Sequence, residues 1–194
     1  VTALWGALRT AFADKGTRLV VLSAPPRPLF APQAALPSDA ATAALGAEFS
    51  NYIAQLNAAG IQAPDLTKAV EAEFAQNYYF ARDTHWTPRG AAWSALQLGQ
   101  AIGHTQQKLD EIQFTETFTE KGSLSAVVER ICGARPSAED VPSPMFAAAG
   151  GADALFASGE AATVALVGTS FSNRYQTDAY QVAGALSIAL GAEV

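Results

Sequence analysis

Residues 83–90 read Asp-Thr-His-Trp-Thr-Pro-Arg-Gly, and this stretch indicates how the chain folds around its chemistry. It follows Tyr78–Phe80, an aromatic run with the composition of a strand. Thr87 is a favourable helix N-cap, and Pro88 suits the first helical position because no backbone N–H is needed there. The stretch therefore predicts the end of a strand, a short polar turn, and a helix that continues to about Ile102.

A second junction of the same kind lies further along the chain. Thr163–Val167 is a short apolar run typical of a buried parallel strand, and Gly-Thr-Ser-Phe-Ser follows it at residues 168–172. A helix is predicted from there to about Leu190. A glycine and a serine between a strand and a helix are typical of an exposed nucleophilic hydroxyl, which here would be that of Ser170. The backbone N–H of Ser170 is then a candidate donor to the oxyanion. A serine that only caps the helix is the alternative interpretation.

Asp83 and His85 stand two positions apart, so on an extended backbone both side chains point to the same face. The carboxylate can then hold one ring nitrogen while the other meets Ser170. Because both junctions end predicted parallel strands, we expect them at one edge of a sheet. The pattern predicts a triad of Ser170, His85 and Asp83. The alternative is that Asp83 caps the turn and that His85 packs in the protein interior. A metal site is the other function that an aspartate and a histidine suggest, but two ligands are too few for one.

The rest of the chain predicts a layered α/β domain that spans residues 1–194. Up to the first motif, the expected elements are a helix at 1–15, a strand at 18–23, a proline-rich loop at 24–37, a helix at 38–59, a short strand at 61–63 and a helix at 64–74.

Residues 105–160 are less regular and are interpreted as an insertion or a lid. A strand is expected at 113–118 and a helix at 123–131, whereas 135–145 contains three prolines and shows no period. Cys132, the only cysteine, is expected to be a small buried hydrophobe. The last three residues look like the beginning of a further strand, so we expect the natural protein to continue.

The composition is that of a globular protein, with 49% apolar and 15% charged residues. The formal charge is −6 and no large cluster of Lys and Arg occurs, which argues against a nucleic-acid partner. Arg82, Arg89 and Arg174 lie beside the motifs and are candidates for binding a polyanion, with solvated surface arginines as the alternative. Tyr175 and Trp86 are further candidate substrate contacts, although Trp86 can equally be a core residue.

Residues 83–91 and 168–172 together resemble the SGNH-hydrolase-like domain of the AlgJ and AlgX family of alginate O-acetylation proteins. The resemblance implies a three-layer α/β/α fold with a mainly parallel central sheet. It also implies that Ser170 is the nucleophile, His85 the general base and Asp83 the residue that orients it. No cofactor is implied, and an acetyl-serine intermediate is expected.

The resemblance further implies a periplasmic domain of a Gram-negative bacterium, tethered to the inner membrane in the full-length protein. It would receive acetyl from a membrane-bound O-acyltransferase partner, pass it to polysaccharide hydroxyls, and work beside other subunits of an exopolysaccharide complex. Two alternatives stay open. One is an acetylesterase of the same fold. The other is a non-catalytic polysaccharide-binding scaffold, which predicts that Ser170 and His85 are not in mutual reach.

Overall fold

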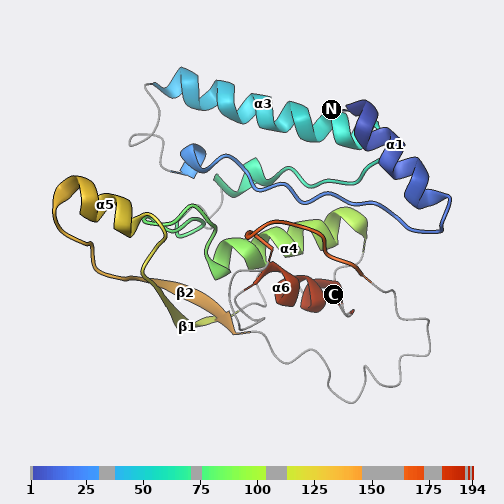
Figure 1. Ribbon diagram of the computed structural model, residues 1–194. Coiled ribbons are helices and arrows are strands. Elements are labelled where there is room, and N and C mark those ends of the chain that lie inside the picture. Colours follow the sequence, from blue (N-terminus) through green and yellow to red (C-terminus); the bar gives the residue numbers. More distant parts are fainter. Residues whose placement is uncertain are drawn as a thin grey trace, which may run out of the picture. The chain divides into compact units, whose positions relative to one another are not determined.

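The computed structural model describes residues 2–30, 38–70, 76–103, 113–145, 164–172, 181–190, 192 and 194 (Figure 1). The chain divides into two compact units, Val1–Ala75 and Gln76–Val194. That the two units act as one domain stays a prediction. None of the described helices is both long and apolar enough to cross a membrane.

The first unit contains helices α1 (Thr2–Ala13) and α3 (Asp39–Ala58) and the 3-10 helices η1 (Arg27–Phe30) and η2 (Leu66–Val70). Both long helices lie where the sequence predicted them. α3 begins at Ser38, whose hydroxyl accepts the backbone N–H of Ala41 at 3.2 Å. The core of this unit is formed by the end of α3 and the segment after it, with α1 and residues 19–21 packed against them: Ile53, Leu56, Ile61, Ala63, Trp5, Leu19, Val21, Phe49 and Tyr52.

The two strands expected in this unit are reduced to a single parallel bridge between Val20 and Gln62. Pro64 explains part of this. The backbone N–H of Val21 donates to the carbonyl of Gln62 at 3.0 Å, so the next residue of this segment to face residues 18–23 in a longer parallel ladder would be residue 64, and proline has no N–H to donate. The helix expected at 64–74 is described only as the five-residue η2; residues 71–75 lie outside the described part.

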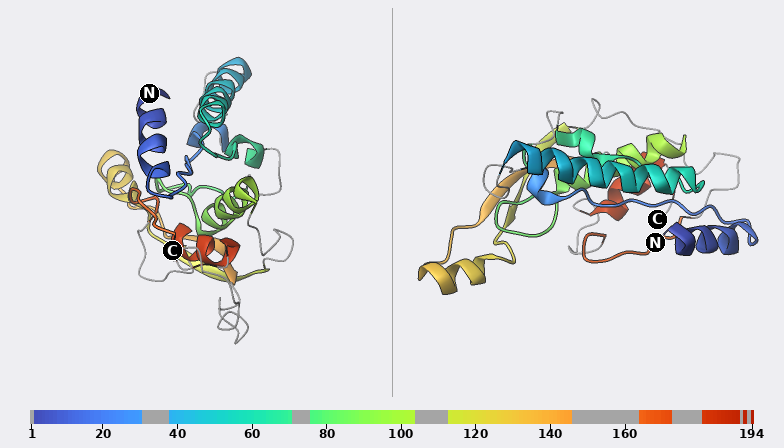
Figure 2. Two further views of the ribbon diagram at one scale, coloured as in Figure 1. Left: turned by 90° about the vertical axis from the view of Figure 1, so that its right-hand side faces the viewer. Right: turned by 90° about the horizontal axis from the view of Figure 1, so that it is seen from above.

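The second unit contains α4 (Pro88–Ile102), β1 (Gln113–Glu120), α5 (Ser125–Cys132), β2 (Glu139–Met145) and α6 (Val182–Leu190). α4 begins as predicted, because the Thr87 hydroxyl accepts the N–H of Gly90 at 3.1 Å and Pro88 is the first helical residue. α6 packs along α4, where Leu96 and Ala189 form a small core with Phe114 against it (Figure 2).

β1 and β2 pair antiparallel, from Gln113 opposite Met145 to Glu120 opposite Glu139, and α5 lies between them in the sequence (Figure 1). We call residues 113–145 the arm. Residues 135–145, whose sequence shows no period, contain the strand β2 at 139–145. Pro142 and Pro144 hid the strand pattern in the sequence, but β2 tolerates them because β1 is its one neighbour among the described strands.

The mainly parallel central sheet is not found among the described residues, whose one sheet is the antiparallel pair β1–β2. A buried parallel strand was expected at 163–167, but residues 164–167, the described part of that range, belong to no described strand, and Val167 is 92% exposed. An apolar run becomes a buried strand only beside another strand, and the two strands that the structure describes pair with each other.

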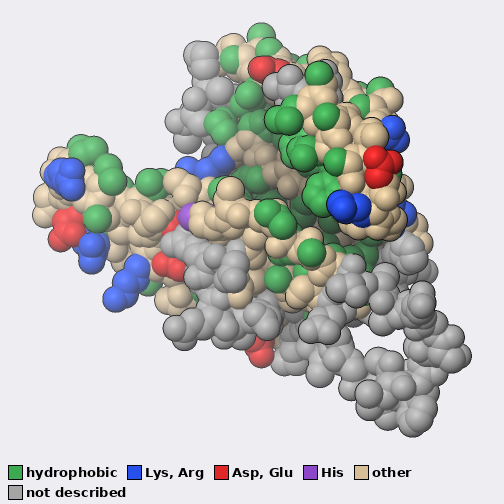
Figure 3. Space-filling view, turned by 45° about the vertical axis from the view of Figure 1, so that its right-hand side comes forward, with side chains coloured by type: hydrophobic (Ala, Val, Ile, Leu, Met, Phe, Trp, Pro, Cys, Tyr) green, Lys and Arg blue, Asp and Glu red, His purple; other side chains and the backbone are tan. Residues whose placement is uncertain are grey.

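Cys132 is the last residue of α5 and is exposed, so the expectation that it is buried is wrong. α5 lies at the end of the arm that is remote from α4 and α6 (Figures 1 and 2). Ile131 is 76% exposed there. The same end carries charges of both signs, including a salt bridge of 3.0 Å between Arg135 and Glu129 (Figure 3).

Candidate active site

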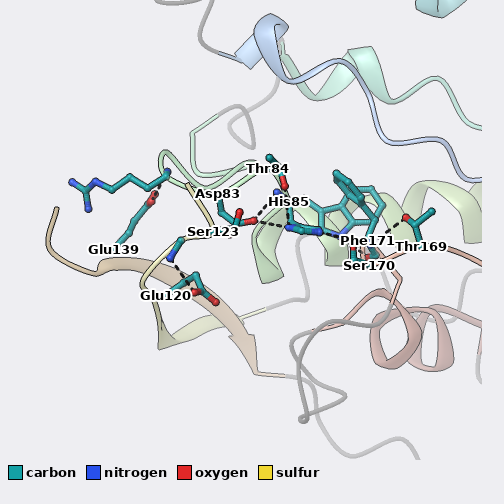
Figure 4. Close-up of polar contacts among 12 residues, drawn as sticks. Asp83, Thr84, His85, Glu120, Ser123, Glu139, Thr169, Ser170 and Phe171 are labelled. Atoms are coloured by element: carbon teal, nitrogen blue, oxygen red, sulfur yellow. Dashed lines mark hydrogen bonds and ion pairs between the residues drawn. The ribbon is translucent and has the colours of Figure 1, made fainter. Parts of the chain in front are cut away.

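Asp83, His85 and Ser170 form a continuous chain of hydrogen bonds (Figure 4). His85 Nδ1 lies 2.5 Å from Asp83 Oδ1, and His85 Nε2 lies 2.7 Å from Ser170 Oγ. A carboxylate only accepts hydrogen bonds, so in the neutral imidazole the ring proton is on Nδ1 and the lone pair of Nε2 faces the serine. The structure therefore brings the three predicted residues together in the order that a serine nucleophile requires.

A tight hairpin positions Asp83 and His85, in place of the end of a parallel strand. Tyr79 and Trp86 form an antiparallel bridge, and the backbone N–H of Thr87 donates to the carbonyl of Tyr78 at 2.9 Å. We call residues 78–87 the catalytic hairpin. At its tip Asp83 Oδ1 also accepts the backbone N–H of His85 at 2.9 Å. The carboxylate thus caps the turn and orients the imidazole at the same time. The turn-capping role and the orienting role, which the sequence offered as alternatives for Asp83, are therefore compatible.

The second oxygen of Asp83 is held by a residue that the sequence did not suggest. The backbone N–H of Ser123, in the turn before α5, lies 2.5 Å from Asp83 Oδ2. Asp83 is completely buried, and a buried carboxylate needs donors on both oxygens because it has lost its water. Every residue except proline has a backbone N–H, so the residue type at position 123 could not have predicted this contact.

The nucleophile lies in a compact turn over residues 169–172. The backbone N–H of Ser172 donates to the carbonyl of Thr169 at 2.8 Å, and the N–H of Phe171 donates to the Thr169 hydroxyl at 3.3 Å. Gly168 permits the turn, because a Cβ at this position would lie 2.9 Å from Cβ of Ser172. Ser170 is exposed. The helix α6 begins only at Val182 and residues 173–180 lie outside the described part, so an oxyanion role for the Ser170 N–H stays a prediction.

Trp86 joins the two motifs. Its indole N–H donates to the carbonyl of Phe171 at 3.1 Å, and the Phe171 ring lies across it with centroids 5.3 Å apart and an interplanar angle of 85°. The same phenyl ring lies 4.8 Å from the imidazole of His85. Trp86 is 5% exposed, so the interpretation as a platform for sugar stacking is wrong and the core interpretation is correct.

The arginines beside the motifs have structural contacts. Arg82 donates from Nη1 to the carbonyl of Ser137 at 2.7 Å, and Arg89 places its guanidinium carbon 4.9 Å from the ring centre of Phe114. Binding of an anionic polymer by these side chains stays a prediction. Arg174 and Tyr175 lie outside the described residues. Within the described ranges, no group of three or more His, Cys, Asp or Glu side chains is placed to hold a metal ion.

Residues 1–194 match the family described as "SGNH hydrolase-like domain, acetyltransferase AlgX". The probable alginate O-acetylase AlgJ of Pseudomonas syringae pv. tomato is 34% identical over 206 residues, which cover 99% of this chain and 51% of that protein. The alginate biosynthesis protein AlgX of Pseudomonas aeruginosa is 30% identical, over 97% of this chain and 41% of its own length. The chain thus spans about half the length of these curated relatives.

Two solved structures have a similar fold. AlgX of Pseudomonas aeruginosa superposes with a TM-score of 0.72 and 28% identity, over 99% of this chain and 47% of that one. The O-acetyltransferase domain of Pseudomonas putida AlgJ gives a TM-score of 0.69 over 100% of this chain and 66% of that one, with 22% identity, and supports the fold alone. The fold is therefore the SGNH-hydrolase-like fold of AlgX and AlgJ.

Proposed function

The chain belongs to the family of the SGNH hydrolase-like domain of acetyltransferase AlgX, and from this we propose that it transfers acetyl groups to hydroxyls of an alginate-like bacterial exopolysaccharide. One observation carries the proposal: the unbroken contact from Asp83 through His85 to an exposed Ser170. An exposed nucleophile suits a polymeric acceptor, because a long chain can lie across the surface without entering a closed pocket.

In the proposed first half-reaction, Ser170 Oγ attacks the carbonyl carbon of the acetyl donor while its proton passes to His85 Nε2. The tetrahedral intermediate then breaks its bond to the leaving group, which departs with the proton from Nε2. Acetyl remains on Ser170 as an ester. The backbone N–H of Ser170 is proposed to stabilise the oxyanion, and a donor of this kind contributes about 3 kcal/mol.

In the second half-reaction a sugar hydroxyl gives its proton to His85 Nε2 as its oxygen attacks the acetyl carbonyl carbon. The bond to Ser170 Oγ breaks, and Oγ recovers the proton from Nε2. Asp83 holds the Nδ1 proton throughout, which keeps Nε2 facing the serine and stabilises the imidazolium that forms in each step.

Acetyl esterase activity is the second candidate, and the exposure of Ser170 favours it, since water reaches the same carbon that a sugar would attack. Chemistry up to acetyl-Ser170 is common to both functions. The third interpretation, a scaffold without catalysis, predicts that Ser170 and His85 are out of reach of each other. Their contact at 2.7 Å argues against it.

The discriminating experiment supplies p-nitrophenyl acetate as donor, with and without oligomannuronate as acceptor, and separates released acetate from acetylated oligosaccharide by mass spectrometry. We expect acetylated oligosaccharide to increase with acceptor concentration until it exceeds acetate. Hydrolysis that still dominates at saturating acceptor assigns the chain to the esterases, and absence of acetyl-Ser170 in every condition removes both enzymatic functions.

We also propose the setting in which the domain works: the periplasm of a Gram-negative bacterium, tethered to the inner membrane, with acetyl delivered by a membrane-bound O-acyltransferase and other exopolysaccharide subunits as partners. This proposal rests on the resemblance of residues 83–91 and 168–172 to the AlgJ and AlgX family. Cell fractionation of the tagged full-length protein tests its place, and crosslinking from the face around Ser170 tests its partners.

A three-layer α/β/α arrangement with a mainly parallel sheet is proposed for the native domain. The parallel bridge between Val20 and Gln62 supports it, as does the similarity to AlgX. Backbone NMR of the full-length protein would test it, because residues 18–23, 61–63 and 163–167 should then show strand shifts and slow amide exchange.

A further inference from the structure

The arm is attached to the catalytic hairpin by the carboxylate of Glu139, the first residue of β2 (Figure 4). Both oxygens of this carboxylate lie 2.9 Å from the backbone nitrogen of Ala81, and Oε2 also accepts the N–H of Arg82 at 3.3 Å. Hydrogen bonds from backbone N–H groups to an ionised carboxylate are stronger than neutral ones. Residues 81 and 82 immediately precede Asp83, so this attachment acts directly on the chain that carries the candidate base and its orienting residue.

Arg82 is held to the arm at three points in all. Besides its N–H on Glu139, its carbonyl accepts the N–H of Leu124 at 3.0 Å, and its guanidinium donates to the carbonyl of Ser137 at 2.7 Å. Gly122 fits against the same carbonyl. Its φ is +81°, and a Cβ there would overlap the carbonyl group of Arg82. The backbone at 122–124 and the backbone at 82 therefore lie in direct contact.

Ser123 lies in the middle of that contact, and its N–H reaches Asp83 Oδ2 at 2.5 Å. The turn that presents this N–H is shaped within the arm as well, since Glu120 Oε1 accepts the N–H of Gly122 at 3.0 Å. The position of the Asp83 carboxylate, and with it the imidazole of His85, thus depends on how the arm is seated on residues 81 and 82.

We propose that Glu139 is a positioning residue for the Asp83–His85 pair. It acts by seating the arm on the catalytic hairpin so that the Ser123 N–H holds Oδ2 of Asp83. The region first interpreted as an insertion or a lid is, in this proposal, a support of the active site. The effect on catalytic rate rests on the proposed function, whereas the effect on the Asp83–His85 hydrogen bond does not.

Removal of the Glu139 carboxylate is expected to act on rate more than on binding of a small ester, because Glu139 contacts only backbone groups of the hairpin. A misplacement of catalytic groups by about 1 Å costs about a hundredfold in rate. We expect Glu139→Ala to slow acetylation of Ser170 by p-nitrophenyl acetate by about ten- to a hundredfold with KM nearly unchanged. Glu139→Gln keeps one oxygen acceptor and should lose less.

The neighbouring carboxylate Asp140 provides the matched control. It lies on the same strand, and its Oδ1 accepts the hydroxyl proton of Thr119 at 2.5 Å on β1. Asp140→Asn removes a charge from the arm beside Glu139 and leaves the contacts to residues 81 and 82 in place. It should acetylate Ser170 at the wild-type rate. Thermal unfolding followed by circular dichroism shows whether each variant is folded at the assay temperature.

Proton NMR gives a second readout that does not need acetyl transfer. The Nδ1 proton of His85, shared with Asp83 across 2.5 Å, should give a resonance far downfield in the wild type and in Asp140→Asn. In folded Glu139→Ala the resonance should move upfield or vanish by exchange with water. Equal acetylation rates together with an unchanged resonance in folded Glu139→Ala overturn the proposal, and so does an equal loss in Asp140→Asn.

Failure of the proposed function has a different signature. If the wild-type protein forms no acetyl-Ser170 with any donor, the enzymatic function is removed and the rates carry no information. The resonance then decides by itself: its loss in Glu139→Ala and retention in Asp140→Asn support the positioning role, and its retention in both contradicts it.

Discussion

The indole N–H of Trp86 donates to the backbone carbonyl of Phe171 at 3.1 Å, and so joins the residue after the candidate base to the residue after the candidate nucleophile. The rings of Trp86 and Phe171 also pack together at an interplanar angle of 85°, and the Phe171 ring lies against the imidazole of His85. The 2.7 Å contact between His85 and Ser170 therefore has a second, independent link beside it.

We predict that Trp86→Phe slows acetylation of Ser170 by about tenfold, because an aromatic ring remains but the donor to Phe171 is lost and the serine turn can shift. The cost in unfolding free energy should be about 1 kcal/mol, because the carbonyl that loses its donor is only partly buried. Burst kinetics and urea unfolding measure the two effects.

Trp93→Phe is the control, since Trp93 is also buried but packs on Tyr78 from α4. It should lose stability with little change in acetylation rate. A Trp86→Phe enzyme with wild-type burst kinetics would show that the link does not position the nucleophile.

The second prediction concerns the three hydrogen-bonded residues. Ser170→Ala and His85→Ala should reduce turnover by about six powers of ten, and Asp83→Ala by about four, as in other serine triads. Asp83→Ala should differ in stability as well. It leaves the N–H groups of Ser123 and His85 without their acceptor, which costs about 1–3 kcal/mol for each buried group.

The measurement is steady-state turnover of p-nitrophenyl acetate beside thermal unfolding for each variant. Ser170→Ala should unfold like the wild type, because Ser170 is exposed. A Ser170→Ala protein that retains acetyl transfer would show that another group is the nucleophile.

The third prediction uses two glycines with almost equal φ angles. Gly122 has φ +81° and Gly133 has φ +76°, so alanine at either position is strained by roughly 1–2 kcal/mol. Only at Gly122 would the new Cβ also overlap Arg82, whereas at Gly133 nothing lies within 4 Å. Gly122→Ala should therefore lower the melting temperature further and slow acetylation of Ser170, while Gly133→Ala should change only the melting temperature.

Circular dichroism melts and burst kinetics on the two variants check this comparison. Equal effects of both substitutions would mean that close packing of the turn on residue 82 is unimportant for the site.

The fourth prediction is a pH dependence. Tyr78 is completely buried, and burial, together with the neighbouring Tyr79, raises its pKa well above 10.0 despite its hydrogen bond to Ser94. In the unfolded chain Tyr78 ionises near its ordinary value of about 10. Above that pH the unfolded state releases a proton that the folded state keeps, so the stability contributed by Tyr78 is present below about pH 10 and lost above it.

Urea unfolding from pH 9 to pH 11 in wild type and Tyr78→Phe measures this effect. Stability should decline less steeply in Tyr78→Phe, although that variant is less stable at neutral pH because it lacks the hydroxyl that lies 2.6 Å from Ser94 Oγ. Parallel slopes in the two proteins would contradict the assignment.

Local rules explain why parts of the fold were predictable from the sequence. The Thr87 cap, Pro88 at the first helical position and the end of α4 at Ile102 depend on neighbours within one or two turns, and the structure has all three. The spacing of Asp83 and His85 is likewise local, since two positions along a short turn put the carboxylate within reach of the imidazole. The pairing with Ser170 needed the two motifs to be read together.

Tertiary structure decided what depends on partners distant in the sequence. The apolar run before Ser170 has the composition of a strand, yet residues 164–168 have no described strand to pair with, whereas the proline-containing β2 pairs because β1 lies beside it. The contacts that hold Asp83 also depend on a distant partner. The amino-acid sequence by itself determined which three residues supply the carboxylate, the imidazole and the hydroxyl of the site. Only the folded arm decided which backbone N–H would hold the second carboxylate oxygen, because every residue except proline carries that group and its position alone makes it specific.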